Sequence, residues 1–559
     1  MKDLNITNPK NGEKTNMANI SFYGSHNASI TVEQVGEILV VLEVERFANV
    51  KNLGYAQYFC ASSRDYLLDH ILSYIEKEYG IKEFETCIYQ NTSVIDDLSL
   101  KDSKLMQRLK NLNAVEEDKG VIHYQFLIPA KHYYEGQHHL SHAAGAFYQT
   151  DYDQALIVSF DGGGNDGIFN IYHAKDRKTI DLLEKKDYLD LGFPYMSFGD
   201  FFSDIKLEQS LAIGNLVYSG KIMGLCSYGN VNEEWLPYFE EYYLDKPSGL
   251  NHIELLDKLS NQTGLIFDRN QRLEGQTAWD AAKTSQVAFE NILIREIQPF
   301  LDEYPDIPLI LTGGCGLNIL LNTKLKESLD RDIFVPPNPN DCGLSSGMML
   351  NHIKPEKAID LTYSGVQVLD PYTLSSYVEN KGAVKASKAK VVDLLAQGKI
   401  IGVVRNGSEH GPRALGNRSI LCDPTFPQMK DVLNHKVKNR EWYRPFAPVC
   451  RLEDVSKYFE FEGESRWMSF CPKVKEEWRE KLVSITHVDG TARVQTVTEE
   501  QNPWLYSVLT ILHESTGVGV LLNTSFNVNG KPILSTYRDA IKVFENTEMD
   551  NLLLDEYLF

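Results

Sequence analysis

The stretch HHLSHAAGAFY places His138 and His142 four residues apart. On a helix this spacing puts both imidazoles on one face, one turn apart, where they can bind the same metal ion. Because most pairs with this spacing are incidental, a metal site needs further ligands. Asp161 ends an apolar strand and begins DGGGNDG. Asp341 is the last residue of NPND and stands at the expected start of a helix. Two imidazoles and two carboxylates predict iron or another divalent metal with open positions, and exclude a cysteine-rich structural zinc.

Basic residues are concentrated in a second part of the chain. Between Arg405 and Arg444 there are eight Lys or Arg against four Asp or Glu, in a protein of formal net charge −21. They lie among glycines and prolines, and arginine in rigid loops suits bidentate binding of phosphate. RNA is the rival ligand, but the acidic remainder of the chain and the lack of interleaved aromatic residues argue against it. The eight residues are Arg405, Arg413, Arg418, Lys430, Lys436, Lys438, Arg440 and Arg444.

Glycine-rich turns suggest a second anion site. The segment 308–328, PLILTGGCGLNILLNTKLKES, predicts a strand, a glycine turn and a helix. Its glycines would let backbone N–H groups approach an oxyanion at the helix start. A plain strand–helix turn remains the alternative, because GGxG alone is weak evidence.

The pattern of strands predicts a duplicated α/β unit. Residues 20–50 and 155–184 both read as an apolar strand, a turn of small or polar residues and a returning strand. Each is followed by helical material, so two similar halves with a cleft between them are expected. The polar segment from about 355 to 385 could join this unit to a second domain.

Length and composition limit the class of protein. A chain of 559 residues is too long for one ordinary core. No apolar run approaches the roughly 20 residues that span a bilayer, and residues 1–19 predict a disordered leader and not a signal peptide. Eight cysteines without a CxxC pair favour a reducing, cytoplasmic location. The acidic charge argues against a nucleic-acid or membrane partner and leaves room for a cationic small substrate.

Several motifs resemble one enzyme family. HHLSHA, SFDGGGNDG, SGKIMGLCSYG, LTGGCGLN and PNDCGLSSG resemble, in this order, the N-terminal part of the NodU/CmcH-type O-carbamoyltransferases. GSEHGPRALGNRSILCDP, KVKNREWYRPFAP and LLNTSFNVNGKPI resemble their C-terminal part. The resemblance covers roughly residues 20–559. It implies an actin/Hsp70-like (ASKHA) unit over 20–370, related to the threonylcarbamoyl transferase of tRNA modification, and a YrdC-like α/β domain over 371–559.

The same resemblance implies roles for particular residues. GSHNAS stands where the family has GHDAS, which makes His26 the candidate base, with Asn27 in place of the usual Asp. Lys531 replaces the usual Glu of GEPI. The metal ligands implied are His138, His142, Asp161 and Asp341. Carbamoyl phosphate and ATP would be bound by Arg413, Lys438, Arg444 and Arg493, with Asn523 and Ser525 as further contacts. The adenylate in the N-terminal cleft would be bound by Gly162, Gly163, Gly164, Gly313, Gly314, Asn318 and Lys221.

The implied reaction has two steps. Carbamoyl phosphate and ATP, with Mg²⁺, would form carbamoyl adenylate in the C-terminal domain. The carbamoyl group would then pass to a hydroxyl of a small secondary-metabolite acceptor at the Fe²⁺ or other divalent metal site. Two alternatives stay open: a tRNA- or protein-directed carbamoyltransferase, and an inactive nucleotide-binding scaffold. The hydrogenase-maturation relative is disfavoured because its CxxC segments are absent from this sequence. A homodimer is an expectation that the sequence leaves open.

Overall fold

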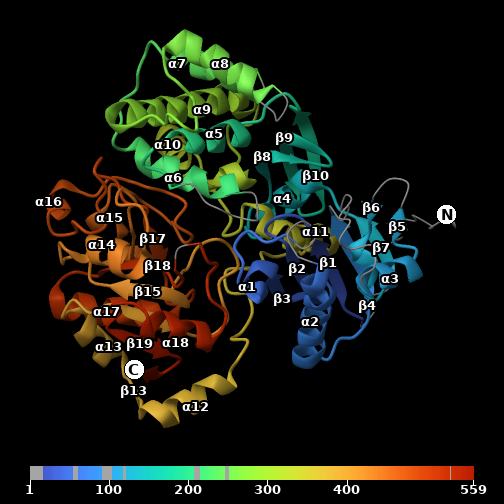
Figure 1. The fold of residues 1–559 in the computed structure, drawn as a ribbon, viewed down its shortest axis with the longest axis vertical. Helices are drawn as coiled ribbons and strands as arrows, with labels where there is room; N and C mark the ends of the chain where they lie inside the picture. The colour runs from blue at the N-terminus through green and yellow to red at the C-terminus, as the bar shows by residue number, and fades with distance from the viewer. Residues whose placement is uncertain are drawn as a thin grey trace.

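The computed structural model describes residues 17–54, 61–90, 104–116, 121–206, 214–245, 251–528 and 530–559. Most of the expected leader, residues 1–16, lies outside the described residues. Two units are visible in Figure 1, an N-terminal one coloured blue to yellow-green and a C-terminal one coloured orange to red. Among the described helices, none has the length and apolar character needed to cross a membrane.

The N-terminal unit contains two five-stranded sheets with the same strand order. The first sheet has the order β3-β2-β1-β4-β7 and the second β10-β9-β8-β11-β12. In both sheets, the first three strands along the chain form an antiparallel meander. The fourth strand pairs parallel to the first, and the fifth pairs parallel to the fourth. The first sheet consists of β1 Asn19–Tyr23, β2 Ser29–Gln34, β3 Glu37–Glu43, β4 Phe84–Gln90 and β7 Ala130–Glu135. The second consists of β8 Ala155–Gly164, β9 Gly167–Asp176, β10 Thr179–Lys185, β11 Leu309–Thr312 and β12 Ile333–Phe334.

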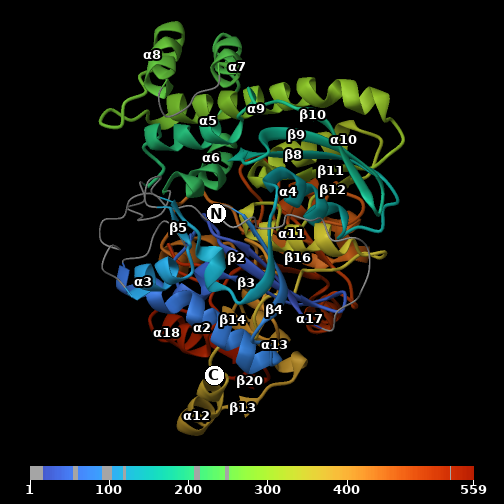
Figure 2. The same cartoon turned by 90° about the vertical axis from the view of Figure 1, so that its right-hand side faces the viewer.

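This repeated topology confirms the duplication predicted from residues 20–50 and 155–184, and with it the actin/Hsp70-like class. Two helices lie between the sheets: α4, His138–Phe147, packs on β8, β9 and β11, and α11, Leu344–Ile353, packs on β1, β2 and β4 (Figure 2). They contact each other through glycines. A Cβ on Gly347 would lie 2.0 Å from the carbonyl oxygen of Ser141, and one on Gly145 3.1 Å from Cα of Gly347. This close crossing brings the histidines of α4 next to the start of α11.

Further helices surround the sheets of the N-terminal unit. A mostly helical layer lies beyond the second sheet, at the top of Figure 1. It contains α5 Gly192–Ser197, α6 Tyr218–Cys226, α7 Leu236–Leu244, α8 His252–Thr263, α9 Gly275–Glu303 and α10 Ile319–Ser328. Smaller elements of the first half are α1 Val44–Ala48, α2 Ala61–Tyr79, α3 Lys104–Asn111, β5 Val115–Glu116 and β6 Val121–Ile122.

The C-terminal unit is built on one eight-stranded mixed sheet, of order β13-β20-β19-β14-β15-β18-β16-β17. Helices α13 and α17 share an apolar cluster with residues of β14, β15, β16, β17, β18 and β19. The strands are β13 Val384–Lys385, β14 Ile401–Val404, β15 Arg418–Cys422, β16 Ala447–Arg451, β17 Gln495–Val497, β18 Val520–Ser525, β19 Asn551–Leu554 and β20 Tyr557–Leu558. The helices are α12 Tyr372–Lys381, α13 Lys388–Leu395, α14 Met429–Val432, a π-helix Leu433–Lys438, α15 Val455–Tyr458, α16 Glu476–Arg479, α17 Pro503–Thr516 and α18 Tyr537–Glu545.

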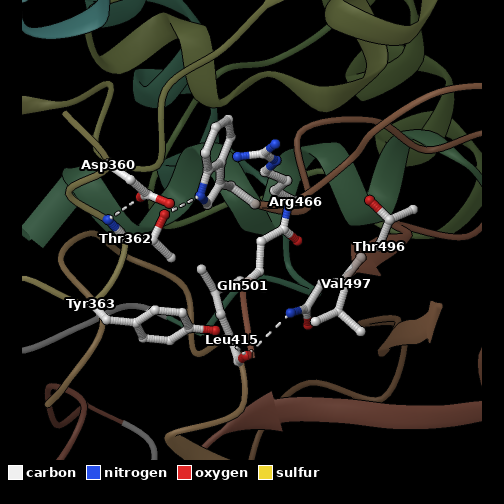
Figure 3. Close-up of a pocket in the computed structure, with 10 residues that line it drawn as sticks. Asp360, Thr362, Tyr363, Leu415, Arg466, Thr496, Val497 and Gln501 are labelled. Carbon is white, nitrogen blue, oxygen red and sulfur yellow. Dashed lines mark hydrogen bonds between the residues drawn. The ribbon is translucent and has the colours of Figure 1, made fainter. Parts of the chain in front are cut away.

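An extended segment, residues 354–371, connects the two units and hydrogen-bonds to both. The N–H of Val41 in β3 donates to the carbonyl of Ser364 at 2.8 Å, and the N–H of His410 donates to that of Thr362 at 2.9 Å. A cavity of about 10 Å³ lies where the segment meets the C-terminal unit, lined among others by Thr362, Tyr363 and Leu415 (Figure 3). The hydroxyl of Tyr363 donates to the carbonyl of Leu415, two residues after Arg413. The predicted boundary at residue 370/371 falls within this segment and stays a prediction.

Candidate functional site

The four predicted metal ligands meet in the N-terminal unit. One donor atom from each of His138, His142, Asp161 and Asp341 lies within 4.8 Å of the others. Nε2 of His142 is 3.2 Å from Nε2 of His138, 3.4 Å from Oδ2 of Asp161 and 3.5 Å from Oδ1 of Asp341. The histidines come from α4, Asp161 from β8 and Asp341 from the turn before α11. Rigid elements therefore fix all four side chains.

The donor set fits a divalent ion. Oδ1 of Asp341 is buried without a hydrogen-bond donor and lies 3.6 Å from Nε2 of His138. Burial disfavours the protonated form of both histidines and lowers the pKa of His138. For His142 the carboxylates of Asp161 and Asp341 outweigh burial and raise its pKa to about 9. A cation between these four groups would replace that proton, and two imidazoles with two carboxylates suit iron or a similar ion.

Neighbouring groups hold the carboxylates in place. The hydroxyl of Tyr23 donates to Oδ2 of Asp341 at 2.5 Å. The N–H groups of Gly314 and Gly162 donate to the two oxygens of Asp161 at 2.5 and 2.6 Å. Such second contacts orient ligands and tune the metal they bind. Tyr23 was not predicted, because nothing in NISFY distinguishes a tyrosine that reaches a ligand from one in the core.

The prediction placed the N–H groups of the glycine loops at an adenylate phosphate, whereas in the structure several of them donate to groups of the protein. Gly162 and Gly314 use their N–H groups on Asp161, and the N–H of Gly313 donates to the carbonyl of Pro339 at 2.8 Å. Gly164 is needed for packing, since a Cβ there would lie 2.2 Å from Cβ of His138. Gly163, with a φ of +129°, is exposed and lies in the part of β8 where the strand register shifts, between Phe160 and Gly164. The N–H groups of Gly162, Gly313 and Gly314 thus donate to groups of the protein, and their contact with an adenylate phosphate stays a prediction.

Asn318 also has a structural position. Its side-chain oxygen accepts from the N–H of Leu321 and caps α10, and its amide exchanges hydrogen bonds of 3.0 and 3.1 Å with Gln286 of α9. The residue is buried, at 5% exposure. A capping role accounts for Asn318 without a ligand, so its predicted contact with the adenylate is not supported by its position.

The predicted base, His26, lies beside the metal ligands. Its Nε2 is 3.4 Å from Oδ2 of Asp341, and its Nδ1 is 3.2 Å from Oδ1 of Asn27. Asn27 has a φ of +56°, in the left-handed region where Asn and Asp are the favoured non-glycine residues. The amide oxygen at position 27 can therefore accept a hydrogen bond from Nδ1, although it lacks the charge of the aspartate usual in the family.

Five cationic side chains form a cluster in the C-terminal unit. Burial and mutual repulsion hold the pKa of Arg440 and Arg493 well below the ordinary value, and that of Arg413 at about 10. Lys438 belongs to the same cluster, because burial and then the charges of Arg440 and Arg444 lower its pKa. Among the described residues, Glu441 is the carboxylate that pairs with this cationic cluster, 3.5 Å from Arg444. A group of desolvated like charges of this kind is suited to polyanions.

Two other predicted residues hold the cluster in position. The ammonium of Lys438 contacts the side-chain and main-chain oxygens of Ser525 and Asn527 at 2.5–3.2 Å. The buried amide of Asn523 donates to the carbonyl of Ala414, next to Arg413, and to Gln495. Lys438 ends a π-helix, a distortion that is frequent at functional sites. Ser525 and Asn523 thus support the cations, and Asn523 does so through the backbone of the loop.

The structure separates the eight basic residues of the sequence into two groups. Arg418 is fully buried and donates to the carbonyls of Arg405, Asn406 and Asn417, so it holds its own loop together. Arg405 stacks on Trp504, and Lys436 pairs with Glu548 on the surface. Arg440 is in the cluster although it was not among the predicted site residues. Its membership of the KNREWYRP motif is the only sequence signal, and a motif does not show which arginine turns inward.

Lys221 and Lys531 both connect the two units. Lys221 is not a surface residue of the N-terminal cleft: its ammonium lies 2.9 Å from the carboxylate of Glu441, in the C-terminal cluster. A contact of Lys221 with an adenylate in the N-terminal cleft stays a prediction. Lys531, which stands where the family usually has a glutamate, donates to the carbonyl of Asn49 at 3.0 Å and so forms a contact between the two units.

Comparison with known proteins places the chain in a family. The carbamoyltransferase N-terminus family matches residues 18–350, and the carbamoyltransferase C-terminus family matches residues 392–559. The protein belongs to the carbamoyltransferase family and is a carbamoyl-transferring enzyme, as its motifs indicated. The His/Asp group lies in the first matched region and the cationic cluster in the second.

The chain is also similar to individual known proteins. The chain is 34% identical to nodulation protein NolO of Bradyrhizobium diazoefficiens, over 75% of this chain and 78% of that protein. It is 29% identical to an uncharacterized protein of Methanocaldococcus jannaschii, over 95% and 98% of the two chains. A solved structure of full-length HypF in the phosphate- and nucleotide-bound form is 15% identical, with a TM-score of 0.34 over 61% of this chain and 47% of that one.

Proposed function

We propose that this enzyme is an ATP-dependent O-carbamoyltransferase that makes carbamoyl adenylate in its C-terminal unit and uses it at the His/Asp centre of its N-terminal unit. The observation that carries the proposal is the cationic cluster of Arg413, Lys438, Arg440, Arg444 and Arg493. Its charges repel one another, and one carboxylate pairs with them among the described residues. Two polyanionic substrates held together, carbamoyl phosphate and ATP, would supply the missing negative charge.

In the first step, water releases phosphate from carbamoyl phosphate, an oxygen of the resulting carbamate attacks the α-phosphorus of ATP, and pyrophosphate leaves, so that carbamoyl adenylate is formed. The chain's contribution is electrostatic. Fixed guanidinium groups offset the repulsion between two polyanions and stabilise charge that develops on the leaving phosphates. Lys438 is held by neutral oxygens of Ser525 and Asn527, so its charge stays available to a phosphate. Mg²⁺ bound to ATP would share this task.

In the second step, an acceptor hydroxyl attacks the carbamoyl carbon and AMP leaves. His26 is the proposed base, because an alcohol is a poor nucleophile near neutral pH and imidazole can accept its proton. The contact between Nδ1 and the amide oxygen of Asn27 favours the tautomer with a proton on Nδ1 and the lone pair on Nε2. A divalent ion bound by His138, His142, Asp161 and Asp341 would supply Lewis-acid polarisation at this centre.

The acceptor is proposed as a small hydroxylated molecule. The net charge of −21 would favour a cationic acceptor and disfavour tRNA. The experiment combines the protein with ATP, Mg²⁺ and carbamoyl phosphate, and follows pyrophosphate release. Mass spectrometry of a panel of alcohols then detects gain of one carbamoyl group. Absence of pyrophosphate release that depends on carbamoyl phosphate would refute the first step, and modified nucleosides in added bulk tRNA would refute the acceptor class.

A further inference from the structure

A buried ion pair joins α6 of the N-terminal unit to the cationic cluster. Nζ of Lys221 lies 2.9 Å from Oε1 of Glu441, and the two side chains are only 3% and 1% exposed. The same ammonium donates to the carbonyl of Lys206 at 3.2 Å and lies over the ring of Tyr218. Lys221 is thus fixed on its own unit, and Glu441 is the group that it holds on the other.

Glu441 stands where it could interfere with substrate binding. In sequence it lies between Arg440 and Arg444, and its second oxygen is 3.5 Å from the guanidinium of Arg444. Burial disfavours the charged carboxylate, but Lys221 and then Arg444 lower its pKa, so it stays ionised. A free carboxylate beside these arginines would neutralise them and compete with phosphate oxygens. Its pairing with Lys221 keeps one oxygen turned toward α6.

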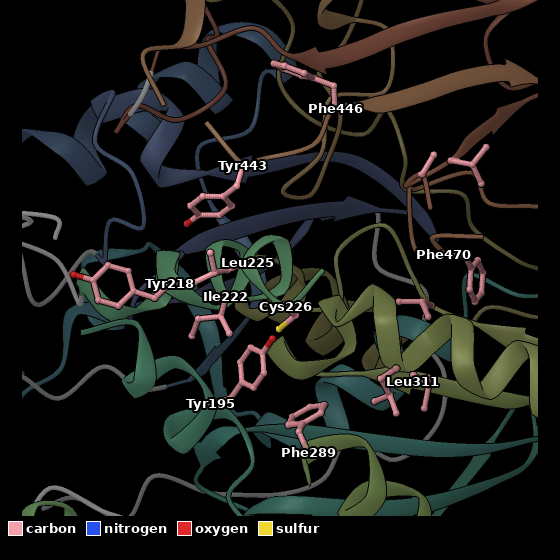
Figure 4. Close-up of a cluster of buried hydrophobic side chains, with 14 of the residues drawn as sticks. Tyr195, Tyr218, Ile222, Leu225, Cys226, Phe289, Leu311, Tyr443, Phe446 and Phe470 are labelled. Carbon is pink, nitrogen blue, oxygen red and sulfur yellow. The ribbon is translucent and has the colours of Figure 1, made fainter. Parts of the chain in front are cut away.

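The loop that carries Glu441 is docked on the same surface by its next residues. Trp442 packs against Tyr228, with ring centroids 5.0 Å apart, and its indole N–H lies 3.4 Å from Asp204. The ring of Tyr443 lies beside α6, 3.4 Å from where a Cβ on Gly224 would be. Figure 4 shows Tyr443 next to Tyr218 and Leu225 of α6. Contacts with the N-terminal unit therefore fix the position of this loop.

We infer that Lys221 is a positioning residue for adenylate formation: it shares the charge of Glu441, which also lies 3.5 Å from Arg444, and so limits how far this carboxylate neutralises Arg444 and competes with carbamoyl phosphate and ATP. The inference rests on the proposed function and deepens it. It means that the site of the first step is completed by the unit that performs the second. Joining both units in one chain then serves the assembly of the cationic cluster as well as the protection of a labile adenylate from water.

The test compares Lys221→Met, Lys221→Arg, Glu441→Gln and the double variant Lys221→Met/Glu441→Gln by pyrophosphate release. In Lys221→Met the released carboxylate competes with substrate, so the KM values for carbamoyl phosphate and ATP rise at least about tenfold, the size of one lost charge-assisted contact, with a smaller change in kcat. Lys221→Arg keeps the pair and stays near the wild-type values. Glu441→Gln removes the competitor, so the double variant recovers most of the loss.

Lys186→Met is the matched control. Lys186 forms a comparable pair with Glu296 at 2.9 Å within the N-terminal unit and outside the cluster. It should lose thermal stability without a change in either KM. Wild-type KM values in Lys221→Met, or a double variant as impaired as Lys221→Met, would overturn the inference. A wild-type protein that releases no pyrophosphate with carbamoyl phosphate would instead overturn the proposed function, so the two failures are distinct.

Discussion

The two charged clusters of the protein differ in how their members interact in the absence of ligand. At the His/Asp centre unlike groups face one another, with Nε2 of His142 3.4 Å from Asp161 and 3.5 Å from Asp341. In the cationic cluster like charges face one another, and Arg413, Arg440 and Arg493 all have a lowered pKa because they are buried together with other guanidinium groups. The first cluster thus pairs unlike groups, whereas the second brings together charges that repel one another.

This difference requires different support from the surrounding chain. The metal ligands lie on helices and strands, and a few hydrogen bonds from Tyr23, Gly162 and Gly314 suffice to orient them. The cationic loops need many fixed contacts. Oε1 of Glu409 accepts from the N–H groups of Leu415, Asn417 and Arg418, and so closes the loop that carries Arg413. Preorganised positive charge of this kind lowers the stability of the folded protein. It also contributes to catalysis, because it binds negative charge without reorganisation.

The largest effect is expected for Arg413→Ala. This change removes a partly buried guanidinium from the cationic cluster, and pyrophosphate release should fall by about 10²–10³-fold or more. Arg405→Ala is the control, because Arg405 stacks on Trp504 outside the cluster and should keep most of the activity. Unchanged pyrophosphate release in Arg413→Ala would remove this residue from the first step.

His142→Ala should affect only the other cluster. Without the imidazole that contacts both carboxylates, metal content should fall, and carbamoyl transfer to an alcohol should be lost. Pyrophosphate release should remain within about twofold of wild type, since separate, non-contacting sites act independently. Metal analysis and both activities check this, with His132→Ala, an exposed histidine outside the centre, as the control. Equal loss of both activities would contradict the division of labour between the clusters.

Gly164→Ala tests how closely the β8–β9 hairpin must approach α4. The new Cβ would lie 2.2 Å from Cβ of His138, so the helix or the hairpin must move. We expect metal affinity to fall about 10–100-fold, as when an orienting contact around a metal is lost. Gly162→Ala is the matched control, because a Cβ there meets nothing within 4 Å. Equal metal affinity in the two variants would show that the contact is not needed.

The sequence predicted the grouping of the two histidines and two aspartates better than the cationic cluster, for a physical reason. The spacing of His138 and His142 fixes their relative position on a helix, and strand ends locate Asp161 and Asp341, so local periodicity carries most of the information. The cationic residues lie in irregular loops whose paths depend on distant contacts. Sequence alone therefore could not show that Arg418 is buried as a structural residue, that Arg440 turns inward, or that Lys221 reaches Glu441 across the interface. Nor could it show that the N–H groups of Gly162 and Gly314 donate to Asp161.

The smallest effect concerns stability and tests the repulsion itself. Arg493→Met removes one like charge and keeps an apolar stem, so the unliganded protein should gain about 1 kcal/mol in free energy of unfolding at low ionic strength. Phosphate or pyrophosphate should stabilise the wild type more than the variant, because bound anions relieve repulsion that the variant no longer has. Urea unfolding with and without inorganic phosphate measures both quantities. Arg466→Met is the control, since Arg466 pairs with Glu464 outside the cluster and should gain nothing. A less stable Arg493→Met protein in low salt would mean that the guanidinium groups are held by partners that offset their charge.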